Sequence, residues 1–209
     1  MRVALIAAVV IAAGAIIALA LHGSRPDELI CPAGLRSDPQ RAARLVELLE
    51  SVPRGRDLVQ DAPGPLHICF AEANTGVVRS DGVFVMDASG DEGAEAARLG
   101  HLLLHLIDGA PLSEPLDPAR ACAVLVAEAM VAEAQAHTLE LRLRRDLQVT
   151  GHLLDPALEA TFWGVPEAQQ VGVIHDALVQ EGGGAGAPDL QRAYTIRCRA
   201  LRSLGAGGG

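Results

Sequence analysis

Residues 91–109, DEGAEAARLGHLLLHLIDG, carry the strongest structural signal in this chain. Acidic residues open the stretch and Asp108-Gly109 closes it, a pattern typical of an α-helix whose ends are complemented. Leucine and isoleucine leave almost no polar face, so the sequence predicts a central, buried helix. His101 and His105 stand four residues apart, about 6 Å along the axis, and therefore project from one face.

A second long helix is predicted over about residues 118–147, rich in alanine at first and basic at its carbonyl end. Aliphatic side chains form one stripe along it, and Glu128 and Glu133 flank opposite edges of that stripe. Either carboxylate could act as third ligand to a metal held by the two histidines, and spacing alone does not choose between them. A histidine pair satisfied within the core is the alternative.

Further helices and a small sheet are predicted before and after these two helices in the sequence. Asp38-Pro39 favours a helix that ends near Val52-Pro53, and residues 53–65 indicate a connection. A strand over residues 66–70 precedes a hairpin with arms at 75–79 and 83–87 around Ser80-Asp81-Gly82, so the sheet is at least partly antiparallel. Further helices are expected over 166–180 and 189–204, separated by a flexible Gly-rich linker (181–188) and followed by a disordered tail (205–209).

In this order of elements, residues 38–147 resemble the short zincin-type metallopeptidase domains. The likeness rests on LVELLESVPRGRDLV, a strand, a hairpin ending in VFVMDAS, the helix AARLGHLLLHLIDG and the helix with EAQAHTLELRLRRDL. The resemblance implies that His101 and His105 bind zinc. It also makes Glu133, within EAQA, the better match to the downstream acidic ligand, with Glu128 as the alternative.

One position departs from the family pattern. Where zincins carry the glutamate of H-E-x-x-H, which activates the metal-bound water, this chain has Leu102. Leucine cannot accept a proton, so the general base is missing, and Glu95 lies about 10 Å away along the helix axis. We therefore expect no catalytic residues and a non-catalytic binding or structural module, with a peptide or protein partner beside the hairpin edge. The alternatives are a zinc hydrolase with an unusual base and an architectural envelope protein held by disulfides.

The amino terminus predicts a membrane anchor. Residues 3–21 hold no charged group and span about 28 Å as a helix, close to the hydrocarbon thickness of a bilayer. Arg2 precedes them, which favours a cytoplasmic amino end and export of the remainder to the periplasmic or extracellular side. Cleavage after Ala18-Leu19-Ala20 would instead make the segment a signal peptide and the protein secreted. The predicted class is α+β, in which a linker (22–37) joins a transmembrane helix (1–21) to a mainly helical zincin-like domain (38–180) with a small, partly antiparallel sheet.

Charge and cysteine content restrict the partners and the compartment. The 17 basic residues are all arginine and the net charge is −9, which argues against a nucleic-acid partner. An even number of cysteines in an exported chain predicts two disulfides, with three possible pairings. A bridge from Cys31 to Cys198, for example, would tie the two ends of the domain together. The four cysteines are Cys31, Cys69, Cys122 and Cys198.

Overall fold

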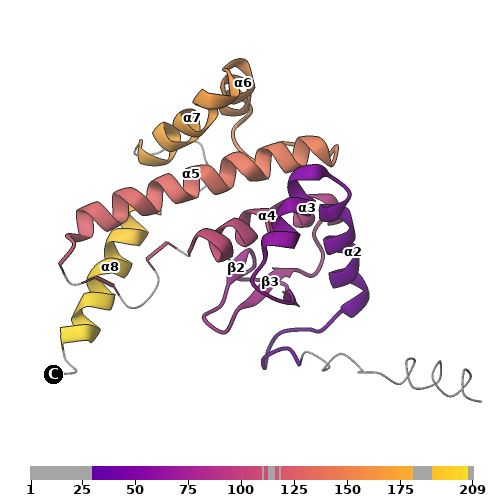
Figure 1. Cartoon of the computed structure of the whole chain (residues 1–209), viewed down its shortest axis with the longest axis horizontal. Helices are drawn as coiled ribbons and strands as arrows, with labels where there is room; N and C mark the ends of the chain where they lie inside the picture. The colour runs from indigo at the N-terminus through magenta and orange to yellow at the C-terminus, as the bar shows by residue number, and fades with distance from the viewer. Residues whose placement is uncertain (1–29, 110, 113–115, 118, 181–189, 207–209) are drawn as a thin grey trace, which may run out of the picture. The chain divides into compact units, whose positions relative to one another are not determined.

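The central element of the fold is helix α4 (Glu92–Asp108), which is buried along most of its length, as the sequence predicts. The computed structural model describes residues 30–109, 111–112, 116–117, 119–180 and 190–206, and residues 33–209 form one compact unit. The Asp91 side chain caps α4 by accepting a hydrogen bond from the backbone N–H of Ala94. Helix α4 contacts α2, α3, α5 and the sheet (Figure 1).

The sheet has three strands, β1 (His67–Ala71), β2 (Val77–Val78) and β3 (Val83–Asp87), in the order β1-β3-β2. Strand β1 runs parallel to β3, whereas β2 runs antiparallel to it, so the prediction of a small, partly antiparallel sheet is confirmed. The first hairpin arm is much shorter than residues 75–79. Arg36 pairs with Phe70 on the outer side of β1, and β2 forms the opposite edge of the sheet.

The predicted connection over residues 53–65 is wrong in its first part, because helix α3 (Pro53–Asp61) follows directly on α2 (Pro39–Glu50). Pro53 is tolerated because it occupies the first turn, where its missing N–H is not needed. Gly55 allows close approach of the two helices, since a Cβ there would lie 2.0 Å from the carbonyl oxygen of Leu49. The glycine that suggests a loop in the sequence is therefore a packing residue.

Helix α5 (Cys122–Asp146) begins four residues later than the expected Pro118 and lies in the middle of the helical part (Figure 1). It contacts α4 on one side and α7 and α8 on others, so its buried residues are not confined to one stripe. Gly100 of α4 faces Leu143 of α5, and a Cβ at this glycine would lie 2.3 Å from the Leu143 Cδ1 atom. The absence of a side chain at Gly100 thus sets the distance between the two helices.

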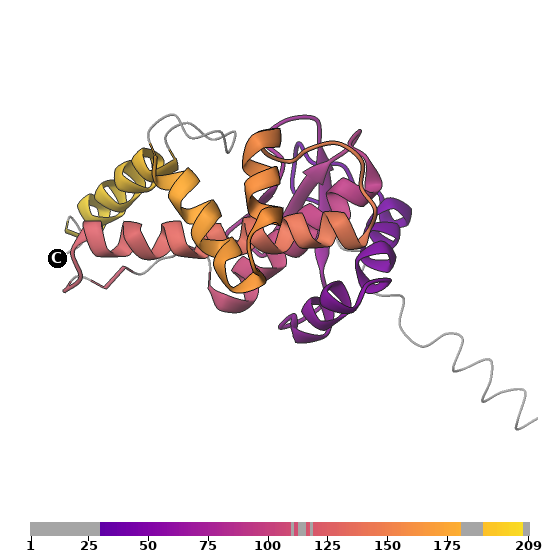
Figure 2. The same cartoon turned by 90° about the horizontal axis from the view of Figure 1, so that it is seen from above.

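Three shorter helices, α6 (Pro156–Gly164), α7 (Glu167–Val179) and α8 (Leu190–Ala206), complete the described structure (Figure 2). The sequence analysis missed α6, although Asp155-Pro156 repeats the capping pattern of Asp38-Pro39. The Asp155 side chain accepts hydrogen bonds from the N–H groups of Ala157 and Leu158. These helices and α5 share a second hydrophobic cluster, separate from the one between α2, α4 and the sheet.

All four cysteines are disulfide-bonded, which confirms the prediction of disulfides. One bridge joins Cys122, at the start of α5, to Cys198 in α8. A bridge between Cys31 and Cys198 is therefore excluded. The Cys122–Cys198 disulfide fixes the last helix to the helix that carries Glu133.

Within the residues that the structure describes, no helix is long and apolar enough to cross a membrane. The predicted membrane segment, residues 3–21, lies outside them. So do the candidate cleavage motif, residues 22–29 of the first linker, the Gly-rich linker 181–188 and residues 207–209 of the tail.

Candidate metal centre

His101 and His105 of α4 meet Glu133 of α5 at the interface between these two helices. The Nε2 atoms of the two histidines lie 3.2 Å apart. One oxygen of Glu133 lies 3.6 Å from His101 Nε2, and its other oxygen lies 3.4 Å from His105 Nε2. All three residues are buried, and the two imidazoles and the carboxylate lie within hydrogen-bonding or ion-pair distance of one another.

The spacing of these atoms fits a bound zinc ion. Tetrahedral zinc binds imidazole nitrogen at about 2.0–2.1 Å and carboxylate oxygen at about 2.0–2.2 Å, which sets the ligand atoms about 3.4 Å apart. The two Nε2 atoms are 3.2 Å apart, and each lies 3.4 or 3.6 Å from a different oxygen of Glu133, so all three distances are near this value. Two imidazole nitrogens and one carboxylate are also a donor set that zinc accepts in proteins.

Glu140, two turns after Glu133 on α5, orients the His101 ring. Its Oε2 atom lies 3.0 Å from His101 Nδ1, and its Oε1 atom accepts a hydrogen bond from Arg98 Nε at 3.1 Å. Burial alone would raise the pKa of Glu140, but the hydrogen bond with His101 and the charge of Arg98 lower it. Since the ionised carboxylate can only accept, we assign a proton to His101 Nδ1, so that Nε2 is the nitrogen whose lone pair would bind a metal.

In the protein without metal, the same groups form an ionic network. Burial lowers the pKa of His101, but hydrogen bonds with Glu133 and Glu140 outweigh this effect and raise it overall. Burial likewise opposes ionisation of Glu133, whose pKa is nevertheless lowered by its contacts with His101 and His105. An ionised Glu133 is the form that would bind a cation.

Tyr194 of α8 is a further partner of Glu133. Its hydroxyl group donates a hydrogen bond to Glu133 Oε1. Burial and the negative charge of Glu133 raise the pKa of Tyr194, so the hydroxyl group stays protonated and remains a donor. The C-terminal helix thus contributes directly to the orientation of a candidate ligand.

His137, one turn after Glu133, completes the cluster of imidazoles. Its ring packs edge-on against His101, with 4.7 Å between ring centroids. Burial, followed by the neighbouring His101, lowers the pKa of His137 to about 4, so this ring is neutral at pH 7.

A cavity of about 540 Å³ opens onto these residues. Leu102, where the resemblance to zincins leads us to expect a general base, lines the cavity as a buried apolar side chain. Glu95 does not line the cavity, and its Oε2 atom accepts a hydrogen bond from the backbone N–H of Asp87 at 2.8 Å. Among the described lining residues, Glu133 is the one carboxylate. The lining also includes Gly76, Val77, Val78, Arg98, His137 and Tyr194.

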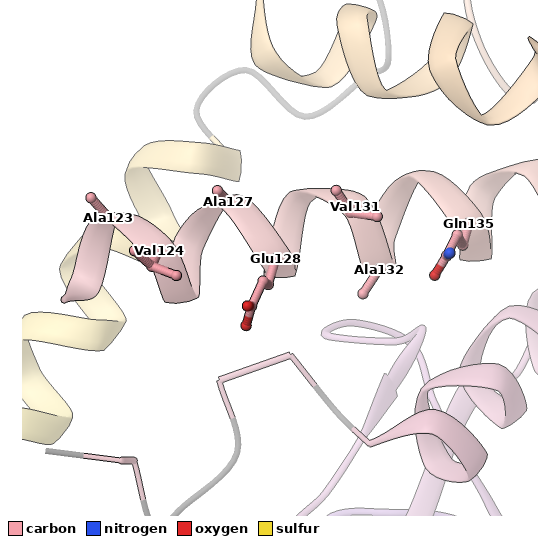
Figure 3. Close-up of a pocket in the computed structure, with 7 residues that line it drawn as sticks. All are labelled: Ala123, Val124, Ala127, Glu128, Val131, Ala132 and Gln135. Carbon is pink, nitrogen blue, oxygen red and sulfur yellow. The ribbon is translucent and has the colours of Figure 1, made fainter. Parts of the chain in front are cut away.

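Glu128, the alternative third ligand, is not brought to the histidines. Its side chain is exposed and forms an ion pair with Arg120. Figure 3 shows it along the first half of α5, in a shallow groove whose other side chains are mainly apolar. The geometry therefore favours Glu133 over Glu128. The residues of this groove are Ala123, Val124, Ala127, Glu128, Val131, Ala132 and Gln135.

The sequence analysis missed Arg98, Glu140 and Tyr194 as parts of the site. Glu140 carries a readable signal, because residues 133, 137 and 140 follow the i, i+4, i+7 spacing of one helical face. Polar residues that share a face of a buried helix are expected to hydrogen-bond with one another or with groups on a neighbouring helix. Tyr194 has no such signal. It reaches the site from a different helix, about 60 residues further along the chain, and helical periodicity relates only residues of the same helix.

Comparison with known proteins gives no relative for this chain: no family model, no curated protein and no solved structure matches it.

Proposed function

We propose that this chain is an exported zinc-binding protein, similar in design to metallopeptidases, whose domain serves as a non-catalytic binding or structural module. The observation that carries the proposal is the convergence of His101, His105 and Glu133 at the separations that tetrahedral zinc requires. The orienting carboxylate of Glu140 on the distal nitrogen of His101 supports it, because metal-binding histidines usually have such a partner.

The lack of a proton acceptor supports the non-catalytic assignment. A positioned general base contributes about 10²- to 10⁴-fold to rate, and Leu102 occupies its place. Glu133, the one carboxylate among the described lining residues, contacts both histidines and Tyr194. A zinc hydrolase with an unusual base therefore has less support than a binding module.

Export to an oxidising compartment is part of the proposal. All four cysteines are disulfide-bonded, as is usual outside the cytosol. An anchor formed by residues 3–21 would hold the domain at the membrane, whereas cleavage would release it.

Metal analysis of the full-length chain, purified without chelators, tests the proposed function. We expect one zinc ion per chain, lost in His101→Ala and retained in His175→Ala, which removes a histidine of α7 that does not line the cavity. A wild-type chain that remains free of metal after zinc is supplied would contradict the proposal.

A peptide partner at the sheet edge is the second part of the proposal. Strand β2 is an outer strand, and Gly76, Val77 and Val78 line the cavity, so an extended peptide could add to the sheet there. A photo-crosslinking residue at exposed Val77 should capture a peptide, whereas one at exposed Val179 of α7 should not. Capture from position 179 alone would refute this edge as the binding site.

A further inference from the structure

The His137 imidazole lies close to two of the three candidate zinc ligands, His101 and Glu133. One nitrogen of His101, one oxygen of Glu133 and one nitrogen of His137 all lie within 4.8 Å of one another. His137 and His105 both line the cavity. The cavity therefore has four potential donor side chains, His101, His105, Glu133 and His137, one more than a catalytic zinc site requires.

The Nδ1 atom of His137 is buried and has no hydrogen-bond partner among the described residues. Such an atom is rare in a folded protein, because a buried polar group without a hydrogen bond is destabilising. Its nearest ionic neighbour is Glu140 Oε2, at 3.9 Å, which already accepts from His101. A small rotation of the ring would bring the His137 Nδ1–H group to this carboxylate and leave the Nε2 lone pair for a metal.

The apolar residue at position 102 and the nearness of His137 then have a single explanation. A catalytic zinc site has three protein ligands and an open position for water, whereas a structural site is closed by a fourth protein ligand. Leu102 provides no base to activate a water molecule, and the His137 ligand atom lies within 4.8 Å of those of His101 and Glu133, close enough for a small shift to bring it to the position of that water. Loss of the base and gain of a ligand both belong to a structural site.

We propose that His137 is the fourth zinc ligand, so that His101, His105, Glu133 and His137 form a closed structural site that joins α4 to α5. This inference rests on the proposed zinc binding and specifies its coordination. It predicts that the metal is inaccessible to exogenous ligands and stabilises the packing of the two helices. The carboxylate of Glu140 would then support two ligands, His101 and His137.

The test uses the full-length chain loaded with Co²⁺. The visible spectrum of Co²⁺ reports the number and geometry of its ligands. We expect intense four-coordinate absorption in the wild type that added azide does not change. His137→Ala should open one position, so that azide alters the spectrum. It should also weaken Co²⁺ binding by at least about 10- to 100-fold, the loss typical when a residue that only hydrogen-bonds to a ligand is removed. His175→Ala should behave as the wild type.

The outcomes separate the two proposals. Azide binding to wild-type Co²⁺ protein would overturn the closed site while leaving zinc binding intact, and this measurement needs no variant to fold. Unchanged Co²⁺ affinity in a folded His137→Ala variant would also overturn it. The proposed zinc site itself would be overturned if the wild-type chain bound no Co²⁺. It would also be overturned if His101→Ala bound Co²⁺ as tightly as the wild type.

Discussion

His101 Nδ1 and Glu140 Oε2 lie 3.0 Å apart, and this contact determines which nitrogen of His101 faces the centre of the site. The two residues are 39 positions apart in sequence and are both buried. With a proton held on Nδ1, Nε2 is the nitrogen that faces His105 and Glu133 and whose lone pair would bind a metal. The contact satisfies the buried Nδ1–H group and leaves Nε2 as the nitrogen available to a metal.

Replacement of Glu140 by glutamine should weaken zinc binding by about 10- to 100-fold, because the amide keeps the shape of the side chain but loses the charge that makes His101 a good ligand. Competition with a chelator of known affinity measures the change. Glu47→Gln, at an exposed position of α2, is the matched control. Equal affinities of Glu140→Gln and the control would show that this carboxylate does not support a metal ligand.

Removal of the Cys122–Cys198 disulfide should reduce both stability and metal affinity. The bridge spans 76 residues, for which loop closure entropy predicts a loss of up to about 4.5 kcal/mol in the free energy of unfolding. Release of α8 would also withdraw the Tyr194 hydroxyl group from Glu133. Denaturant unfolding and chelator competition measure the two effects on a Cys122→Ser/Cys198→Ser variant.

Tyr194→Phe separates these two effects, since it removes the hydrogen bond and keeps the bridge. We expect weaker zinc binding than in the wild type with little loss of stability. If the double serine variant binds zinc as tightly as the wild type, α8 does not contribute to the site.

Leu102→Glu should not create peptidase activity by itself. The buried carboxylate should lower the melting temperature, because position 102 is only 4% exposed, and the closed coordination leaves no water to activate. The double variant Leu102→Glu/His137→Ala supplies both a base and an open position, and should hydrolyse fluorogenic peptides above the rate of either single variant. A double variant that binds zinc but stays inactive would contradict the likeness to metallopeptidases.

Glu159→Gln should destabilise the protein in a pH-dependent way. Burial alone would raise the pKa of Glu159, but the N–H of Leu154, His152 and the N–H of Leu153 lower it. Because the folded pKa lies below the unfolded value of about 4.3, the carboxylate stabilises the fold above that pH and loses this contribution as the pH falls. We expect a loss of about 1 kcal/mol at pH 7.

Denaturant unfolding of the wild type and Glu159→Gln at pH 7 and pH 3.5 measures this effect. The difference between them should shrink at the lower pH. A constant difference would mean that the charge of Glu159 does not stabilise the fold.

Much of the framework could be predicted from the sequence, because local periodicity and capping produce it. The buried histidine helix, the second helix and the parts of the small sheet follow from patterns within single segments. The choice of Glu133 over Glu128 could not be derived, since both flank the same stripe and the rotation of α5 is set by packing against α4, α7 and α8. Helix α3 was missed because the three prolines and two glycines of residues 53–65 suggest a connection, whereas Pro53 is tolerated in the first turn and Gly55 packs closely against Leu49.

The Tyr194 contact and the pairing of Cys198 with Cys122 could not be predicted for a related reason. Both depend on how α8 folds back onto α5, and no local pattern encodes a contact between segments separated by 61 or 76 residues.

The most direct test of the zinc site is a crystal structure of the zinc-loaded protein with anomalous scattering measured at the zinc absorption edge. We predict one anomalous peak at about 2.0–2.2 Å from His101 Nε2, His105 Nε2 and a Glu133 oxygen. A zinc-loaded crystal without a peak between α4 and α5, or with its peak at other side chains, would contradict the account.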